Sequence, residues 1–138
     1  MREFRIHVSK EHYTIYSLVQ LIGEDVLVSV WGGTRPHIGA IGMSVPRPSL
    51  RDPRKLSATS SIFTYVGHKE DLVVRDISES LSSRLKKNVV VTAGVHWDAM
   101  TLKGIETVQY LAQELTERIF LKLARVTAHS NPSEKSSR

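Results

Sequence analysis

The chain of 138 residues carries 19 lysines and arginines against 14 aspartates and glutamates, a formal charge of +5. The absence of cysteine excludes disulfide scaffolds, thiolate zinc sites, iron–sulfur clusters and cysteine nucleophiles. No apolar run approaches the roughly 18 residues of a membrane span and no signal-peptide core follows Met1, so we expect a cytoplasmic protein without a membrane partner.

Five segments of the first half share the short apolar runs or alternating patterns of strands: residues 4–8, 13–22, 26–31, 38–45 and 58–66. The first two runs predict a hairpin, and the third is apolar on both faces apart from Ser29, as in an interior strand. Residues 46–56 are expected to form a loop because prolines interrupt them at Pro46, Pro48 and Pro53.

The hydrophobic period changes in the second half, from His68 onward. Apolar residues at helical spacing predict an amphipathic helix there: Val74, Ile77, Leu81 and Leu85. Residues 88–95 predict a sixth, buried strand, and residues about 101–124 predict a second helix. The serine-rich end has no apolar content to fold around, so we expect a single domain over residues 1–126 and a disordered tail over residues 127–138.

The order of these elements predicts an α+β fold, with a mainly antiparallel sheet of about six strands and two helices on one of its faces. Several strands are apolar on both sides, as Val28, Val30, Leu27 and Trp31 show for the third. The face that the helices leave uncovered must therefore be buried by curling of the sheet or by a second copy. A symmetric homodimer is the commoner solution.

A glycine-rich segment follows the third strand, because four of the eight glycines lie between residues 32 and 42. Glycine permits positive φ, so successive N–H groups there could face an anion, or a flat ligand could approach the backbone. The simpler interpretation is a wide turn followed by a bulged strand. The segment is neither a Walker loop nor a dinucleotide fingerprint, since a strand and not a helix follows it.

Three histidines, His37, His68 and His96, stand at junctions between elements, where functional residues are common. Three imidazoles could hold zinc with an open position, but these lack the close pairing of a zinc-binding helix, and we expect no metal. His68 could simply cap the helix that follows it. His96 could be a base oriented by Asp98 or one half of an ion pair at the end of a strand.

A second charged feature is the basic segment from Arg47 to Lys55, where four cations and one aspartate give a local charge of +3. Nucleic-acid binders usually spread their cations along a helix or a whole face, so we expect no nucleic-acid partner. The segment indicates a small anion, a local partner or a solvated loop. It lies one strand after the glycine-rich segment, within reach of it if the strands pair.

Catalytic residues are not predicted, because no serine lies in a Gly-x-Ser-x-Gly context and the acidic residues show no paired arrangement. Either Trp31 or Trp97 could stack on a planar ligand, although core packing is expected for at least one of them. The residues alone therefore indicate a ligand-binding or dimeric interaction domain.

Three blocks of sequence taken together indicate a more specific function: Trp31-Gly32-Gly33-Thr34-Arg35-Pro36-His37-Ile38-Gly39-Ala40, Gly67-His68-Lys69-Glu70 and Val91-Thr92-Ala93-Gly94-Val95-His96-Trp97-Asp98. In order and spacing they resemble the family of small accessory proteins of prenylated-FMN-dependent decarboxylases, the prenylated-flavin chaperones related to the gallate decarboxylase accessory protein. The resemblance covers about residues 12–124.

That resemblance implies a fold similar to the proteasome-assembly chaperones, a homodimer, and binding of prenylated FMN, or FMN, for a UbiD-type decarboxylase. It does not imply that this chain catalyses decarboxylation. The residues expected to bind the flavin are Gly32, Gly33 and Arg35 at its phosphate, Trp31 or Trp97 at its ring, His37 and His96 at its polar edges, and Gly39 and Asp98 beside them. Two alternatives are an assembly chaperone that binds no small molecule and a metal-dependent hydrolase that uses the three junction histidines.

Overall fold

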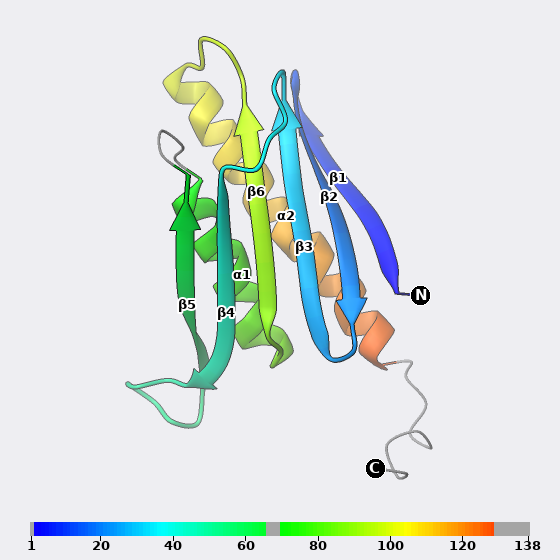
Figure 1. The fold of residues 1–138 in the computed structure, drawn as a ribbon, viewed down its shortest axis with the longest axis vertical. Helices are drawn as coiled ribbons and strands as arrows, with labels where there is room; N and C mark the ends of the chain where they lie inside the picture. The colour runs from blue at the N-terminus through cyan, green and yellow to red at the C-terminus, as the bar shows by residue number, and fades with distance from the viewer. Residues whose placement is uncertain (1, 66–69, 129–138) are drawn as a thin grey trace.

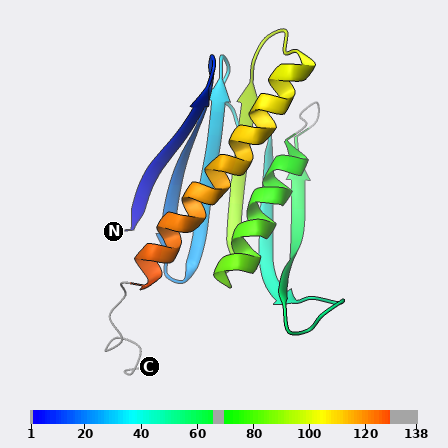
Figure 2. The same ribbon diagram turned by 180° about the vertical axis from the view of Figure 1, so that it is seen from behind.

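The computed structural model of the chain describes residues 2–65 and 70–128, in which one six-stranded sheet carries two helices on one face (Figures 1 and 2). The elements in chain order are β1 (Glu3–Lys10), β2 (Tyr13–Ile22), β3 (Asp25–Gly33), β4 (Ala40–Pro48), β5 (Leu56–Thr64), α1 (Asp71–Leu85), β6 (Val89–His96) and α2 (Leu102–Ala128). The predicted α+β fold is confirmed, with four antiparallel strand pairs and one parallel pair.

Element bounds differ from the sequence expectation around β4, which continues through Pro46 to Pro48 where a loop was predicted. β4 pairs with β6 only over residues 40–44, while its pairing with β5 continues to the end of the strand. Beyond residue 44 one side of β4 is therefore a sheet edge. A proline at such an edge removes no hydrogen bond from the sheet, which explains why two are accommodated.

The helix bounds also differ. α2 runs to Ala128, past the predicted end at residue 124, and includes the first two residues that were expected in the tail. The Thr127 hydroxyl donates to the carbonyl oxygen of Leu123 at 2.9 Å within this last turn. The predicted helix start at His68, the strand end at Val66 and the rest of the tail lie outside the described residues.

The strand order β1-β2-β3-β6-β4-β5 places the last strand of the chain between the third and the fourth. β6 runs parallel to β3 and antiparallel to β4, with Ala93 opposite both Val30 and Ala40. The connection from β3 to β4 must therefore cross β6. β4 then carries the chain away for about 26 Å, at roughly 3.3 Å for each of the eight steps between its nine residues. The basic segment thus lies at the other end of the sheet, and the expectation that it reaches the glycine-rich segment is wrong.

Strand alternation divides the sheet into a covered face and an uncovered one. Val26, Val28 and Val30 of β3 lie on the covered face, at most 4% exposed, in a core completed by α1 and α2. Their neighbours Leu27 and Trp31 lie on the opposite side of the sheet. The two-sided apolar pattern of this strand is thus real, but only one of its sides is buried by the helices.

The uncovered side, here called the open face, is the side of the sheet seen in Figure 1. Large apolar side chains at alternate positions of the strands, and one just past the end of β5, are exposed on it: Tyr16, Met43, Val45, Phe63 and Tyr65. Phe63, the most exposed of these at 66%, lies on β5 opposite Ile41 of β4. Neither helix contributes cover to this face (Figure 2).

The core of α2 gives a direct test of the packing. Leu115→Ala removes a side chain that is fully buried against the sheet, so the free energy of unfolding should fall by about 2 to 5 kcal/mol. Leu121→Ala makes the same change at a half-exposed position of the same helix and should cost no more than about 0.5 kcal/mol. Equal losses in urea denaturation would contradict the arrangement described here.

Candidate functional site

The connection between β3 and β4, residues 34–39, is here called the crossover loop because it passes across β6 on the side of the open face (Figure 1). Backbone hydrogen bonds fix both of its ends to β6. The Thr34 N–H donates to the His96 carbonyl oxygen at 2.8 Å, and the Gly39 N–H donates to the Ala93 carbonyl oxygen at 2.9 Å. The loop is therefore held over the carboxyl end of β6.

The glycines around this loop are required by how closely the chain approaches itself. A Cβ on Gly94 would lie 1.7 Å from the His37 carbonyl oxygen, so no other residue lets the loop cross β6 at this depth. Gly33 has a φ of +88°, and a Cβ there would lie 1.9 Å from the His96 carbonyl oxygen. Close approach of the chain to itself thus explains Gly33, whereas the simpler interpretation of the sequence, a turn followed by a bulged strand, is wrong about the bulge because β4 pairs in continuous register.

His37 joins the crossover loop to the beginning of α1. Its Nδ1 lies 2.9 Å from the Arg35 carbonyl oxygen, and its Nε2 lies 3.0 Å from Oε1 of Glu70. Both nitrogens therefore face oxygen atoms. Two hydrogen bonds form if each nitrogen carries a proton, or if Nδ1 carries one and the carboxyl group donates to Nε2. The side chains of His37 and Glu70 are 25% and 9% exposed, which makes this the more buried of the two histidine–carboxylate pairs in the described structure.

Glu70 is a residue that the sequence argument did not single out. It immediately precedes α1, yet its side chain does not cap the helix and reaches the crossover loop instead. A Cβ on Gly39 would lie 2.4 Å from Oε2 of Glu70, so the carboxylate occupies the space that a side chain at position 39 would need. The only sequence signal for Glu70 was its place in the second block of the resemblance.

His96, the last residue of β6, pairs with Asp98 as the sequence spacing predicts. The His96 Nε2 lies 3.1 Å from Oδ1 of Asp98, and both side chains are exposed. An exposed contact of this kind contributes little to stability because water competes for it. The pair is therefore available to a ligand or partner at this end of the sheet.

The two tryptophans lie on different sides of the sheet. Trp31 stacks on Tyr16 across the open face, with ring centroids 6.1 Å apart and planes 15° from parallel. Trp97 meets the buried Tyr13 edge to face at 5.2 Å and packs against the core. Trp97 thus has the core role that was expected for at least one of the pair, and Trp31 is the tryptophan that faces outward beside the crossover loop.

The structure brings the predicted site residues together at one end of the molecule. They lie at or just beyond the ends of β3 and β6 and in the crossover loop: Trp31, Gly32, Gly33, Arg35, His37, Gly39, His96 and Asp98. Arg35 is exposed within the loop. His68, the third junction histidine, lies outside the described residues. Among residues 2–65 and 70–128, no three histidine, aspartate or glutamate side chains are grouped to hold a metal ion.

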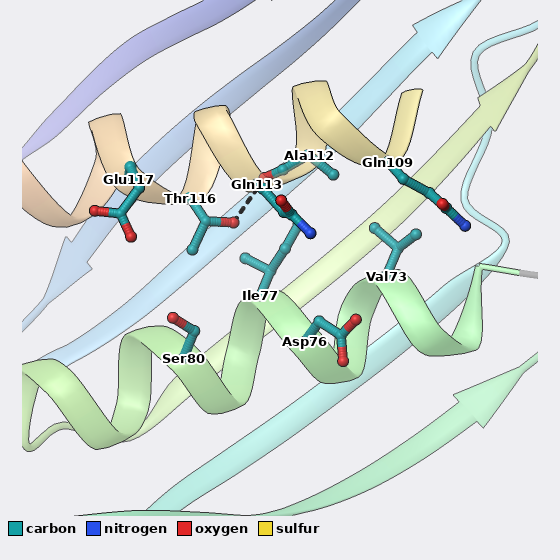
Figure 3. A pocket seen from close by; sticks show the side chains of 9 residues that line it. All are labelled: Val73, Asp76, Ile77, Ser80, Gln109, Ala112, Gln113, Thr116 and Glu117. Atoms are coloured by element: carbon teal, nitrogen blue, oxygen red, sulfur yellow. Dashed lines mark hydrogen bonds between the residues drawn. The ribbon is translucent and has the colours of Figure 1, made fainter. Parts of the chain in front are cut away.

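A pocket of about 520 Å³ lies elsewhere, between the outer surfaces of α1 and α2 (Figure 3). Val73, Ile77 and Ala112 provide apolar surface in it, while Asp76 and Glu117 bring two carboxylates to its rim. A hydrogen bond from Arg84 lowers the pKa of Glu117 below its ordinary value of 4.5, so this carboxylate is charged at neutral pH. None of the predicted site residues lines the pocket, and its carboxylates would repel a phosphate group.

No described helix is both long and apolar enough to cross a membrane.

Comparisons with known proteins identify a family for this chain and a solved structure with a similar fold. Residues 9–124 match the family described as prenylated flavin chaperone LpdD-like domain. Protein LpdD of Lactiplantibacillus plantarum is 25% identical over 123 residues, which are 89% of this chain and 85% of that protein. The fold resembles a chain of a crystallised chaperone complex for yeast 20S proteasome assembly, with a TM-score of 0.51 at 12% identity, over 89% of this chain and 99% of that one.

Gly94→Ala tests whether the crossover loop depends on a missing side chain. The added methyl group should push the loop away from β6, lower the free energy of unfolding by about 1 to 3 kcal/mol, and speed hydrogen exchange at the Thr34 and Gly39 amides.

Gly23→Ala is the control, because a Cβ there meets nothing within 4 Å although its φ is +61°. It should cost about 1 to 2 kcal/mol through backbone strain alone and leave those two amides protected. Unchanged exchange in the Gly94 variant would contradict the packing.

Proposed function

Because the chain belongs to the family of LpdD-like prenylated flavin chaperones, we propose that it binds prenylated FMN and supplies it to a UbiD-type decarboxylase in the cytoplasm. The chain itself carries out no decarboxylation in this proposal. The family match carries the argument, since residues 9–124 contain the whole crossover loop and the strand ends around it. The arrangement at that end of the sheet supplies the candidate binding site.

Cationic and hydrogen-bonding groups of the site suit the phosphate of a flavin nucleotide. A phosphate monoester carries roughly −1.5 to −2 charges near neutral pH and offers three acceptor oxygens. The Arg35 guanidinium is exposed on the crossover loop and can form two parallel hydrogen bonds with such a group. His96 stands at the adjacent strand end, where its Nδ1, the ring nitrogen that does not contact Asp98, can meet the phosphate or a polar edge of the flavin.

The backbone of the crossover loop has a narrower role than the glycine pattern suggested. The N–H groups of Thr34 and Gly39 already donate to carbonyl oxygens of β6. We therefore assign Gly33 and Gly39 to shaping the loop, and we assign charge recognition to the side chain of Arg35. His37 holds the loop in place through Glu70 and faces the ligand only with what remains exposed of its ring.

A flavin ring needs a flat apolar surface near the phosphate site, and Trp31 provides one. Its indole and the Tyr16 ring lie nearly parallel on the open face, next to the start of the crossover loop. A planar heterocycle can stack beside such rings in an offset arrangement, worth about 0.5 to 1.5 kcal/mol beyond the area it buries. Trp97 lies among core residues and is not part of this surface.

The proposed homodimer accounts for the open face. Apolar side chains of β4 and β5 are exposed there without cover from either helix, as Met43, Val45 and Phe63 illustrate. Contiguous apolar surface of this kind marks an interaction site in most soluble proteins. A second copy related by a twofold axis would offer the same surface in return, which makes the contact self-complementary.

A second candidate function follows from the fold similarity to a chain of a proteasome-assembly chaperone complex. The chain would then be a protein-interaction module that uses its open face and binds no small molecule. Neither the exposed Arg35 nor the His96–Asp98 pair would be required by that role. Flavin binding separates the two functions.

Titration of the purified protein with FMN and with prenylated FMN, followed by fluorescence, tests the proposed ligand. Arg35→Ala should weaken binding about tenfold or more, because a charge-assisted hydrogen bond contributes roughly 1.5 to 3 kcal/mol and each 1.4 kcal/mol is a factor of ten. His37→Ala should weaken it to a similar degree by releasing the loop from Glu70.

Arg125→Ala, in the last turn of α2, is the matched control and should leave the affinity unchanged. If neither flavin binds, or if both loop variants bind like the wild type, the site is wrong and the protein-interaction function is favoured.

Light scattering tests the homodimer. The wild type should have twice the mass of the 15.5 kDa chain at micromolar concentration. Phe63→Lys should convert it to a monomer, since the change places a charge on the proposed apolar contact. Leu121→Lys, on the exposed side of α2, should remain dimeric. A wild type that is monomeric would refute the proposal.

A further inference from the structure

The function proposed above leaves one prominent feature unused, the end of the β4–β5 hairpin. The two strands pair from Ala40 opposite Thr64 to Pro48 opposite Leu56, whereas β6 accompanies β4 only over residues 40–44. The far part of the hairpin therefore continues alone, and its connection projects from the end of the molecule away from the crossover loop (Figures 1 and 2). Residues 47–55 are here called the hairpin tip.

Hydrogen bonds within the hairpin tip hold its backbone in one conformation. The Ser49 N–H donates to the Lys55 carbonyl oxygen at 2.8 Å, and the Lys55 N–H donates to that of Asp52 at 2.9 Å. The Ser49 hydroxyl accepts a bond from the Arg51 N–H at 3.2 Å. A loop that is ordered before it meets a partner loses less conformational entropy on binding.

The hairpin tip is strongly positive, and one of its cations is held by an ion pair within the tip. Arg54 pairs with Asp52 through two hydrogen bonds, of 3.0 and 3.3 Å. That contact lowers the pKa of Asp52 below its ordinary value of 3.8, so the aspartate is ionised at neutral pH and the local charge of +3 stands. Arg51 and Lys55 make no ion pair with any residue in the described part of the chain, and both are exposed.

An apolar side chain stands among these cations. Leu50 is 90% exposed, more than any other large hydrophobic residue in the described structure. A single exposed leucine is ordinary on a protein surface. At the tip of an ordered, projecting hairpin, however, it has the position of an anchor residue, which fills a pocket on a partner while charged groups around it set the orientation.

We propose that the hairpin tip docks on an acidic patch of a partner protein, with Leu50 entering an apolar pocket and the cations meeting carboxylates around it. The cations are confined to one compact turn, whereas nucleic-acid binding favours cations spread along a face. The identity of the partner rests on the proposed function: it is the decarboxylase that receives the flavin. Docking there leaves the crossover loop, about one strand length away, open to exchange its ligand.

Binding of the purified chain to the flavin-free decarboxylase tests this inference, with flavin affinity of the chain measured alongside. The double variant Arg51→Glu with Lys55→Glu should weaken association with the decarboxylase at least tenfold and leave flavin affinity unchanged. Leu50→Ser should weaken association severalfold without any change of charge. Association of the wild type should also fall as salt is raised from about 0.05 to about 0.5 M, since exposed charges are then screened.

The matched control is the double variant Lys103→Glu with Arg125→Glu, which makes the same change of charge on exposed positions of α2. It should associate like the wild type. Docking through the hairpin tip is wrong if the decarboxylase does not bind, if the tip variants bind it as tightly as the wild type, or if the control weakens association equally. Failure of the wild type to bind flavin would instead refute the proposed function.

Discussion

The position of β6 between β3 and β4 is the constraint on which the rest of the structure depends. The chain must therefore pass across a strand that comes later in the sequence. It passes so close to that strand that a Cβ on Gly94 would collide with the loop. The two hydrogen bonds to β6 and the contact between His37 and Glu70 then hold the loop at three points. A candidate site on a connecting loop thereby acquires a rigid frame, which a binding site needs if its charged groups are to be preorganised.

The same architecture gives the chain three surfaces of different character. The helices bury one face of the sheet and leave the other apolar and open, suited to a second copy of the chain. The proposed flavin site lies at the carboxyl ends of the parallel strands β3 and β6, while the nine residues of β4 carry the basic hairpin tip to the far end. The proposed ligand site and the self-association face therefore adjoin on the open face, where Trp31 and Tyr16 lie, whereas the docking point lies at the other end of the sheet from the ligand site.

Much of the fold could be predicted from the sequence, because the period of the apolar residues indicates whether a segment is a helix or a strand and which of its faces is buried. It predicted all six strands and both helices, and the pairing of His96 with Asp98. It could not report strand order, since the partner of β3 is separated from it by some sixty positions, as the pairing of Val30 with Ala93 shows. For that reason Gly94 could not be recognised as a crossing point nor Glu70 as a partner of His37. Pro46 and Pro48 misled the loop assignment because an edge tolerates what an interior strand does not.

Amide hydrogen exchange with and without prenylated FMN tests the central claim, that the crossover loop and the strand ends beside it form the ligand site. Bound flavin should add protection in residues 31–39 and 94–98, with little change in the hairpin tip or in the pocket between α1 and α2. Protection confined to that pocket, or none anywhere at a saturating concentration of flavin, would contradict it.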